Sequence, residues 1–223
     1  MKTDFMKVYF ISGLAADSRV FRNIRLPENC EPVFLDWIDP LPAESLQHYA
    51  LRLAEGIDSH QPFGIVGLSM GGMITTEIAR QRKPAVTILI SSIPRSKELP
   101  FYFKLAGSLK LHKLLPVTAV KKAAKFKHVF SLESLDDKSL LHQIIEDSDN
   151  RFIAWAIDAV LQWKNDQAPV DYIHIHGNKD EVLPIRFTHP THIINKGGHL
   201  MVMTRAREVN AILRDAFTRA NTA

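Results

Sequence analysis

Ser69 lies between two glycines and is the residue best placed for nucleophilic chemistry. It belongs to GLSMG (67–71), which fits Gly-x-Ser-x-Gly, between an apolar run that predicts a strand (63–69) and a pattern that predicts a helix (71–83). A sharp turn from strand to helix with small neighbours exposes a serine hydroxyl. The alternative is a glycine-rich turn that serves only close packing. The flanking strand and helix favour a nucleophile.

A serine nucleophile needs a general base, and His199 has the best position among the ten histidines. It lies in NKGGHLMVM (195–203), after the apolar run THIIN and before a predicted C-terminal helix. A loop at the carboxyl end of a last strand can carry a base over the serine. His192 is the nearest competitor, but strand alternation predicts that it lies beside the sheet.

An acid that orients the base is predicted from the same kind of position. Asp180 lies in HGNKDEVLP (176–184), in the loop that follows a buried strand. A carboxylate there can accept the Nδ1–H of His199 and fix the tautomer of the imidazole. The alternative is a solvated turn aspartate, as its neighbour Glu181 illustrates. The loop position favours the orienting role.

The predicted elements alternate in a way that can position these side chains. Strands that alternate with helices predict an α/β fold with a doubly wound, mostly parallel sheet. Short, nearly continuous apolar runs predict strands buried on both faces at 7–13, 31–37, 63–69, 85–92 and 170–177. Helical patterns lie between and after them at 43–57, 71–83 and 204–220.

Residues 94–169 break this alternation, because they contain no convincing strand. Helical patterns cover 102–115, 139–147 and 150–163, which predicts a helical insertion carried on the sheet. Lysines crowd its first part. A solvated helix face is the favoured interpretation of them, and attraction of an anionic substrate or surface is the alternative. These lysines are Lys104, Lys110, Lys113, Lys121, Lys122, Lys125 and Lys127.

The three candidate residues also occur in an informative order. The order Ser69, Asp180, His199, together with the acid loop GNKDEVLP and the histidine loop GGH, resembles the α/β-hydrolase superfamily over nearly the full length of the chain. The resemblance implies two parts. They are an α/β-hydrolase core at 1–93 and 170–223 and a helical cap over the pocket at 94–169.

Two backbone N–H groups are candidates for an oxyanion hole. The tight turn predicts the N–H of Met70, the residue after the serine, as the first donor. The resemblance implies a second donor just after the first strand, where the N–H of Leu14 is favoured and that of Ala15 is the alternative. The superfamily often has His-Gly at this turn. This chain has Ser12 and Gly13 instead, which leaves the hydrogen bonding of the loop open.

No metal or cofactor motif competes with this interpretation. The chain has one cysteine, no His-Glu-x-x-His run, and neither a Gly-x-Gly-x-x-Gly nor a Walker loop. His174 and His176 share one face of a predicted strand, where hydrogen-bonded histidines are favoured over a metal site. We therefore expect neither a metal nor a nucleotide cofactor.

Composition and charge fit an ordinary globular protein and give no argument for a nucleic-acid partner. The chain has 223 residues, of which 46% are hydrophobic, and its net charge of +4 without a long basic run gives no argument for nucleic acid. The first apolar run is short and broken by Ser12 and Gly13, unlike a signal peptide. No stretch approaches the ~20 apolar residues of a membrane span. We expect a cytoplasmic protein without stable membrane insertion.

Together these expectations predict acyl transfer to water. His199 would deprotonate Ser69, which would attack the carbonyl of a small carboxylic ester or related acyl substrate and form an acyl-enzyme. The alternatives are a lyase or carbon–carbon bond hydrolase with the same three residues, and a non-catalytic sensor of a small molecule. No oligomeric state is predicted.

Overall fold

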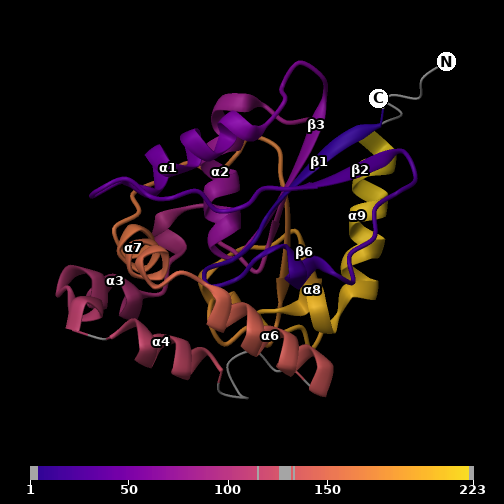
Figure 1. The fold of residues 1–223 in the computed structure, drawn as a ribbon. Coiled ribbons are helices and arrows are strands. Elements are labelled where there is room, and N and C mark those ends of the chain that lie inside the picture. Colours follow the sequence, from indigo (N-terminus) through magenta and orange to yellow (C-terminus); the bar gives the residue numbers. More distant parts are fainter. Residues whose placement is uncertain (1–4, 115, 126–131, 133, 221–223) are drawn as a thin grey trace.

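A six-stranded sheet forms the centre of the molecule, and all of its neighbouring strands are parallel (Figure 1). The computed structural model describes residues 5–114, 116–125, 132 and 134–220. The strand order is β2-β1-β3-β4-β5-β6, which confirms the predicted α/β fold with a parallel sheet. The strands are β1 (Met6–Ile11), β2 (Cys30–Phe34), β3 (Phe63–Leu68), β4 (Val86–Ile90), β5 (Ile173–Gly177) and β6 (His192–Ile194).

Helices cover both faces of this sheet and the edge at which its strands end (Figure 1). The first two helices lie against one face and the last two against the other. Between β4 and β5 the described residues form helices and no strand, as predicted. The helices are α1 (Leu46–Leu53), α2 (Met70–Arg82), α3 (Phe101–Ser108), α4 (Val117–Ala124), α6 (Leu135–Asp147), α7 (Asn150–Leu161), α8 (Met201–Thr204) and α9 (Ala206–Ala220).

Short 3₁₀ helices join several of these elements. The helix predicted at 102–115 is divided in the structure. It consists of α3, which ends at Ser108, and the separate 3₁₀ helix η4. No helix among the described residues is both long and apolar enough to cross a bilayer. The 3₁₀ helices are η1 (Ser18–Phe21), η2 (Ala54–Gly56), η3 (Ser96–Glu98), η4 (Leu111–Leu114) and η5 (Ile185–Phe187).

The central strands of the sheet are buried on both faces because they are apolar at successive positions. The same burial was predicted for 31–37 and is wrong there, because β2 lies at the edge of the sheet and exposes part of its length. On β1, Val8 and Phe10 pack into the cluster that contains Phe217 of α9. The alternate residues Tyr9 and Ile11 pack into the cluster formed with α1 and α2. Two-sided burial is the property that the continuous apolar runs predict for a parallel sheet. It holds the carboxyl ends of β1 and β3 side by side.

Helix α7 is packed into the main core. Phe152 and Ala156 belong to the same buried cluster as Tyr49 of α1. The indole of Trp155 lies over Tyr49, with 4.3 Å between the ring centroids, and its Nε1–H donates to the carbonyl oxygen of Glu44. Aromatic packing therefore fixes α7, the last helix before β5, against the sheet and its helices.

Helix α4 is an element that the sequence patterns did not predict. Pro116 stands directly before α4 as its N-cap residue, at a point where a proline in the sequence suggests an interruption of the helical region. Proline is well suited to the start of a helix, because the first backbone N–H groups have no partner within it. This helix matters for the site described below. Lys127, one of the lysines noted in the sequence, lies outside the described residues.

Candidate active site

Ser69 occupies a strained turn between β3 and α2. Its φ is 53° and its ψ is −119°. A residue with a side chain rarely adopts such a positive φ. Two contacts hold the turn against the neighbouring strand: the Ser69 N–H donates to the carbonyl oxygen of Ile90 at 2.9 Å, and Ser92 Oγ donates to that of Ser69 at 2.7 Å. The hydroxyl is thus held above the carboxyl end of β3.

The two glycines around Ser69 are required by close backbone packing. A Cβ at Gly67 would overlap the carbonyl oxygen of Gly71, and a Cβ at Gly71 would overlap the carbonyl oxygens of Ser12 and Ile11. Backbone atoms of β1 cannot move aside without disturbing the sheet. The Gly-x-Ser-x-Gly pattern is therefore a packing requirement of the sharp turn, as the sequence predicted.

We predict that Gly71→Ala destabilises the protein by roughly 3 kcal/mol or more, because overpacking here displaces backbone and not a flexible side chain. Gly56→Ala is the matched control. A Cβ at Gly56 would meet only Leu35 Cδ2 at 3.5 Å, an ordinary contact. Its stability should stay within about 0.5 kcal/mol of the wild type. Urea unfolding measures both, and equal stabilities would contradict the packing requirement.

His199 lies within hydrogen-bond distance of both Ser69 and Asp180. His199 Nε2 is 2.9 Å from Ser69 Oγ, and His199 Nδ1 is 2.9 Å from Asp180 Oδ2. A carboxylate oxygen only accepts, so the hydrogen lies on Nδ1 and the hydroxyl donates to Nε2. The three residues follow β3, β6 and β5, and the sheet brings them together as the loop positions predicted. His192 lies elsewhere, with Nδ1 2.9 Å from Thr191 Oγ1.

The Asp180 carboxylate is buried and surrounded by donors. Its Oδ1 accepts the N–H groups of Val182 and Leu183, each at 2.9 Å. Burial alone would raise the pKa of Asp180, but the imidazoles of His199 and His176 outweigh it and hold that pKa below its ordinary value. Asp180 is therefore ionised at neutral pH, as an acid that stabilises a charged imidazole must be.

His174 and His176 form a second buried network behind the acid, as hydrogen-bonded strand histidines. His176 Nε2 donates to the carbonyl oxygen of Leu183 at 2.8 Å and lies 3.3 Å from Asp180 Oδ2. Its Nδ1 must then accept from His174 Nε2, 3.2 Å away. Among the described residues, no group of three or more His, Cys, Asp or Glu side chains is arranged to hold a metal ion.

Burial, with a smaller contribution from His176, lowers the pKa of His174 from 6.5 to about 3. The unfolded chain therefore binds a proton at His174 below pH 6.5 that the folded protein does not bind until about pH 3. Stability must fall as the pH decreases across this interval, because the unfolded state binds more protons there. The contribution is fully present above pH 6.5.

We predict that replacing His174 by Asn removes this dependence. Between about pH 6.5 and 4.5, the wild type should lose up to roughly 1.4 kcal/mol per pH unit through this one group. His174→Asn should show a shallower loss, whatever its stability at neutral pH. His60→Asn, at an exposed histidine, is the control and should follow the wild type. Identical slopes in all three proteins, measured by urea unfolding, would show that His174 titrates normally.

The turn after β1 lies directly beside Ser69. A Cβ at Gly13 would be 3.3 Å from Ser69 Cβ and 3.9 Å from Ser69 Oγ. Ser12, which stands where the superfamily often has histidine, donates its Oγ–H to the carbonyl oxygen of Ala16 at 2.9 Å. This hydrogen bond closes the turn. Within the described part of the chain, the N–H groups of Leu14 and Met70 make no backbone or side-chain hydrogen bond. Both remain available as donors.

A small apolar cavity of about 150 Å³ opens at Ser69 and His199. Leu14 forms part of its wall, and side chains from three helices between β4 and β5 form much of the rest. The sequence did not predict these lining residues. From the three helices they are Val120, Lys121 and Ala124 of α4, Leu141 and Ile145 of α6, and Ile153 of α7.

Among the described lysines of residues 104–125, Lys121 is the one that lines this cavity. It is only 9% exposed, and its ammonium donates to the carbonyl oxygens of Glu146 and Ser148 at 3.1 and 2.6 Å. Those carbonyls lie at the C-terminal end of α6, where a cation is favoured by the helix dipole. Lys121 therefore joins α4 to α6, and the predicted solvated face is wrong for this residue.

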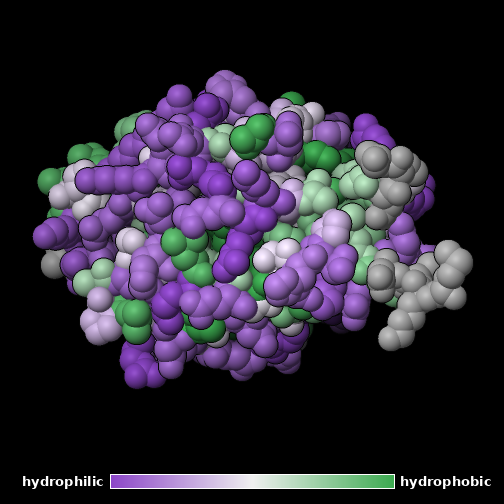
Figure 2. Space-filling view, turned by 90° about the horizontal axis from the view of Figure 1, so that it is seen from above, coloured by the Kyte–Doolittle hydropathy of each residue, from purple (hydrophilic) through white to green (hydrophobic). Residues whose placement is uncertain are grey.

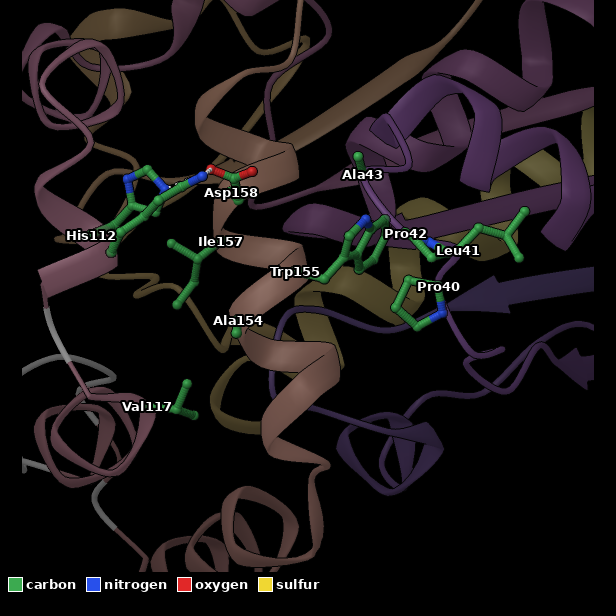
Figure 3. Close-up of a pocket in the computed structure, with 11 residues that line it drawn as sticks. Pro40, Leu41, Pro42, Ala43, His112, Val117, Ala154, Trp155, Ile157 and Asp158 are labelled. Carbon is green, nitrogen blue, oxygen red and sulfur yellow. Dashed lines mark hydrogen bonds and ion pairs between the residues drawn. The ribbon is translucent and has the colours of Figure 1, made fainter.

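A wider hollow of about 640 Å³ lies away from Ser69, over the outer side of α7 (Figure 3). One side is formed by the loop that contains Pro40 and Pro42, and the other by η4. His112 Nε2 is 2.7 Å from Asp158 Oδ1 at its edge. None of Ser69, His199 and Asp180 lines this hollow, so the small cavity is the one associated with the three candidate residues.

Comparisons with known proteins agree with this architecture. The model of the family described as "Alpha/beta hydrolase family" matches residues 8–212. No curated protein matches the chain. A thermophilic esterase from Thermogutta terrifontis is similar in structure, with a TM-score of 0.70 and 17% identity over 96% of this chain and 90% of that one.

Two further solved structures are similar to the same extent. One is MenH from S. aureus, with a TM-score of 0.73 and 16% identity over 97% of this chain and 94% of that one. The other is an enol-lactonase from Burkholderia xenovorans LB400, with a TM-score of 0.72 and 12% identity over 96% and 92% of the two chains. At such identities, the similarity concerns the fold.

Proposed function

The chain belongs to the alpha/beta hydrolase family, and from this premise we propose that it hydrolyses a small carboxylic ester or a related acyl substrate through Ser69. One observation carries the proposal. A continuous line of hydrogen bonds runs from the buried Asp180 through His199 to Ser69 Oγ, and it ends at the wall of an apolar cavity. This arrangement activates a hydroxyl at a place where an acyl group fits.

In the first half of the reaction, His199 Nε2 takes the proton of Ser69 as Oγ attacks the ester carbonyl. The carbonyl oxygen becomes negative and accepts hydrogen bonds from the N–H groups of Leu14 and Met70. Each such donor is worth roughly 3 kcal/mol in comparable sites. His199 then gives its proton to the leaving alkoxide as the carbon–oxygen bond breaks, which leaves an acyl group on Ser69.

In the second half, water replaces the alcohol. His199 Nε2 accepts a proton from the water as its oxygen attacks the acyl carbon. The proton then passes to Ser69 Oγ, which is released with the carboxylic acid product. Asp180 stays ionised throughout and stabilises the imidazolium at both stages. The lowered pKa of Asp180 supports this assignment.

The helices between β4 and β5 serve as a cap in this proposal. Helices α4, α6 and α7 supply the apolar wall opposite Ser69, so they exclude water from the acyl group and limit its size. A cavity of about 150 Å³ favours a short acyl chain. The esterase and the enol-lactonase of the same fold are named for ester substrates, which is consistent with this choice of chemistry.

A series of p-nitrophenyl esters from acetate to octanoate tests the proposal. We expect the highest kcat/KM for the acetate and butyrate esters, because longer chains exceed the cavity. Absence of hydrolysis with every ester, in a folded protein, would contradict ester hydrolysis. The alternatives would then be a lyase or a carbon–carbon bond hydrolase that uses the same three residues, or a non-catalytic sensor of a small molecule.

Ile145→Ala should shift the chain-length preference toward octanoate, because Ile145 lines the cavity and its truncation enlarges it. Ile144→Ala is the matched control, since its side chain is fully buried on the same helix but does not line the cavity. Each substitution should cost about 2–5 kcal/mol of stability. The ratio of kcat/KM for octanoate to that for butyrate should rise only in Ile145→Ala. An equal shift in both variants would contradict the assigned acyl pocket.

A further inference from the structure

Helix α3 exposes an apolar face at the surface of the helices between β4 and β5. Phe101 is 66% exposed, Leu105 56% and Leu109 59%. These residues are four apart, so they lie on one side of the helix and its C-terminal end. Tyr102 is also exposed beside Phe101, with 5.5 Å between the ring centroids. Large apolar side chains gathered on one side of a surface helix mark an interaction site.

The opposite side of α3 is already packed, so the exposed face cannot be buried by a simple rotation of the helix. Phe103 packs against the core cluster that contains α7. Gly107 is buried against Leu161, and a Cβ there would be 3.0 Å from that residue's Cβ and carbonyl oxygen. The orientation of α3 is therefore fixed by α7, and Phe101, Leu105 and Leu109 remain outside.

Positive charge accompanies this apolar face. Residues 101–125 contain six lysines and no acidic residue. Asp158 lies near Lys113, and Glu146 pairs with Lys125, so only part of this charge is balanced by other helices. On α3 and directly after it, Lys104 and Lys110 are exposed, and Lys104 Nζ donates to a backbone carbonyl oxygen, not to a carboxylate.

We propose that this α3 face, defined as Phe101, Leu105 and Leu109 with Lys104 and Lys110, binds peripherally to an anionic lipid bilayer. Phenylalanine and leucine side chains enter the boundary between headgroups and acyl chains, while lysine ammonium groups interact with lipid phosphates. Charge complementarity identifies the occupant. The face combines exposed hydrocarbon with two lysines that form no ion pair with a described carboxylate, and an anionic bilayer offers both hydrocarbon and negative charge.

Other occupants fit the same residues less well. A second copy packed face to face would bring Lys104 and Lys110 against their own counterparts, with no acidic residue in 101–125 to compensate. A nucleic acid would satisfy the lysines but leave Phe101 and Leu105 without an apolar partner. Figure 2 views the side of the molecule on which the strands begin, and hydrophilic residues dominate there. That side is not expected to face the bilayer.

The position of the face gives it a functional meaning that rests on the proposed ester hydrolysis. Helix α3 leads through η4 into α4, and Val120 and Ala124 of α4 line the cavity at Ser69. Binding through α3 would bring that cavity close to the membrane interface. Acyl substrates that partition into lipid would then reach Ser69 from the bilayer surface.

Vesicle co-sedimentation tests the binding without any assumption about activity. The full chain should sediment with vesicles that contain phosphatidylglycerol and weakly with phosphatidylcholine alone, and added salt should reduce the binding. Phe101→Ser and Leu105→Ser should each weaken it about tenfold. Lys104→Glu and Lys110→Glu should each weaken it by about fivefold or more.

Matched changes elsewhere serve as controls. Val170→Ser removes an apolar side chain that is 98% exposed before β5, and Arg82→Glu reverses a charge at the end of α2. Both variants should bind as the wild type does. Ser69→Ala should also bind normally, so failure of the proposed hydrolysis leaves the membrane test intact. The α3 variants should hydrolyse a water-soluble ester normally in the absence of vesicles.

Three results would overturn the proposal. The wild type could fail to bind phosphatidylglycerol vesicles, or the α3 variants could bind as well as the controls. The wild type could also form a dimer that Phe101→Ser dissociates, as measured by analytical ultracentrifugation, with no binding to vesicles. That result would assign the face to a second copy of the chain.

Discussion

Ser69→Ala is expected to lower kcat/KM for p-nitrophenyl butyrate by at least about 10⁴-fold, because the acyl group then has no oxygen to which it can be transferred. The residual rate would come from substrate binding and from the N–H groups of Leu14 and Met70. The folded structure should persist. Alanine can take the same backbone conformation, and the substitution removes one hydroxyl, which bonds to His199 Nε2.

Stability and kinetics together make this result specific. The melting temperature of Ser69→Ala should stay within a few degrees of the wild type, since about 1 kcal/mol corresponds to roughly 2–4 °C in a domain of this size. Ser139→Ala, at an exposed serine of α6, is the control and should retain full activity. Substantial hydrolysis by Ser69→Ala would remove Ser69 from the mechanism.

Asp180→Asn is expected to lower kcat by about 10³–10⁴-fold with little change in KM. An asparagine amide can donate to His199 Nδ1, which would place the hydrogen on Nε2 and leave no acceptor for the Ser69 proton. The carboxylate that stabilises the imidazolium is also lost. Because both effects act on the transition state, they should appear in kcat.

Glu181→Gln provides the matched control for the acid. Glu181 is the next residue in the same loop, and it is exposed, while Asp180 is buried. The same loss of a carboxylate charge should leave kcat within about twofold of the wild type. Equal losses of activity in the two variants would mean that the loop is sensitive to charge in general. A retained rate in Asp180→Asn alone would assign the acid to another residue.

The elements that carry Ser69, Asp180 and His199 could be predicted because their signals are local. Apolar runs long enough for a strand, glycines required by backbone contact, and polar residues just after strands all occur within a few positions of the chain. The parallel sheet then brings the ends of β3, β5 and β6 together. Their meeting required only that the predicted strands run parallel in one sheet, so that their carboxyl ends lie at the same edge, with no knowledge of side-chain packing.

The wall of the cavity could not be predicted in the same way. Val120, Leu141 and Ile153 lie on three helices, and nothing in the spacing within each helix states which residues meet over Ser69. Helix α4 itself was missed, because Pro116 reads as a break as readily as a helix start. The partners of Lys121 are backbone carbonyls at the end of another helix. Every residue has such a carbonyl, so the sequence cannot indicate this contact.

Covalent labelling with a fluorophosphonate tests the central claim most directly, because the reagent forms a stable bond only with an activated serine. Intact-mass spectrometry should show one adduct per chain, and peptide mapping should place it on Ser69. His199→Ala should label far more slowly, since the base that activates the hydroxyl is absent. An adduct on another residue, or ester hydrolysis by a protein whose Ser69 remains unlabelled, would contradict the assignment of Ser69 as the nucleophile.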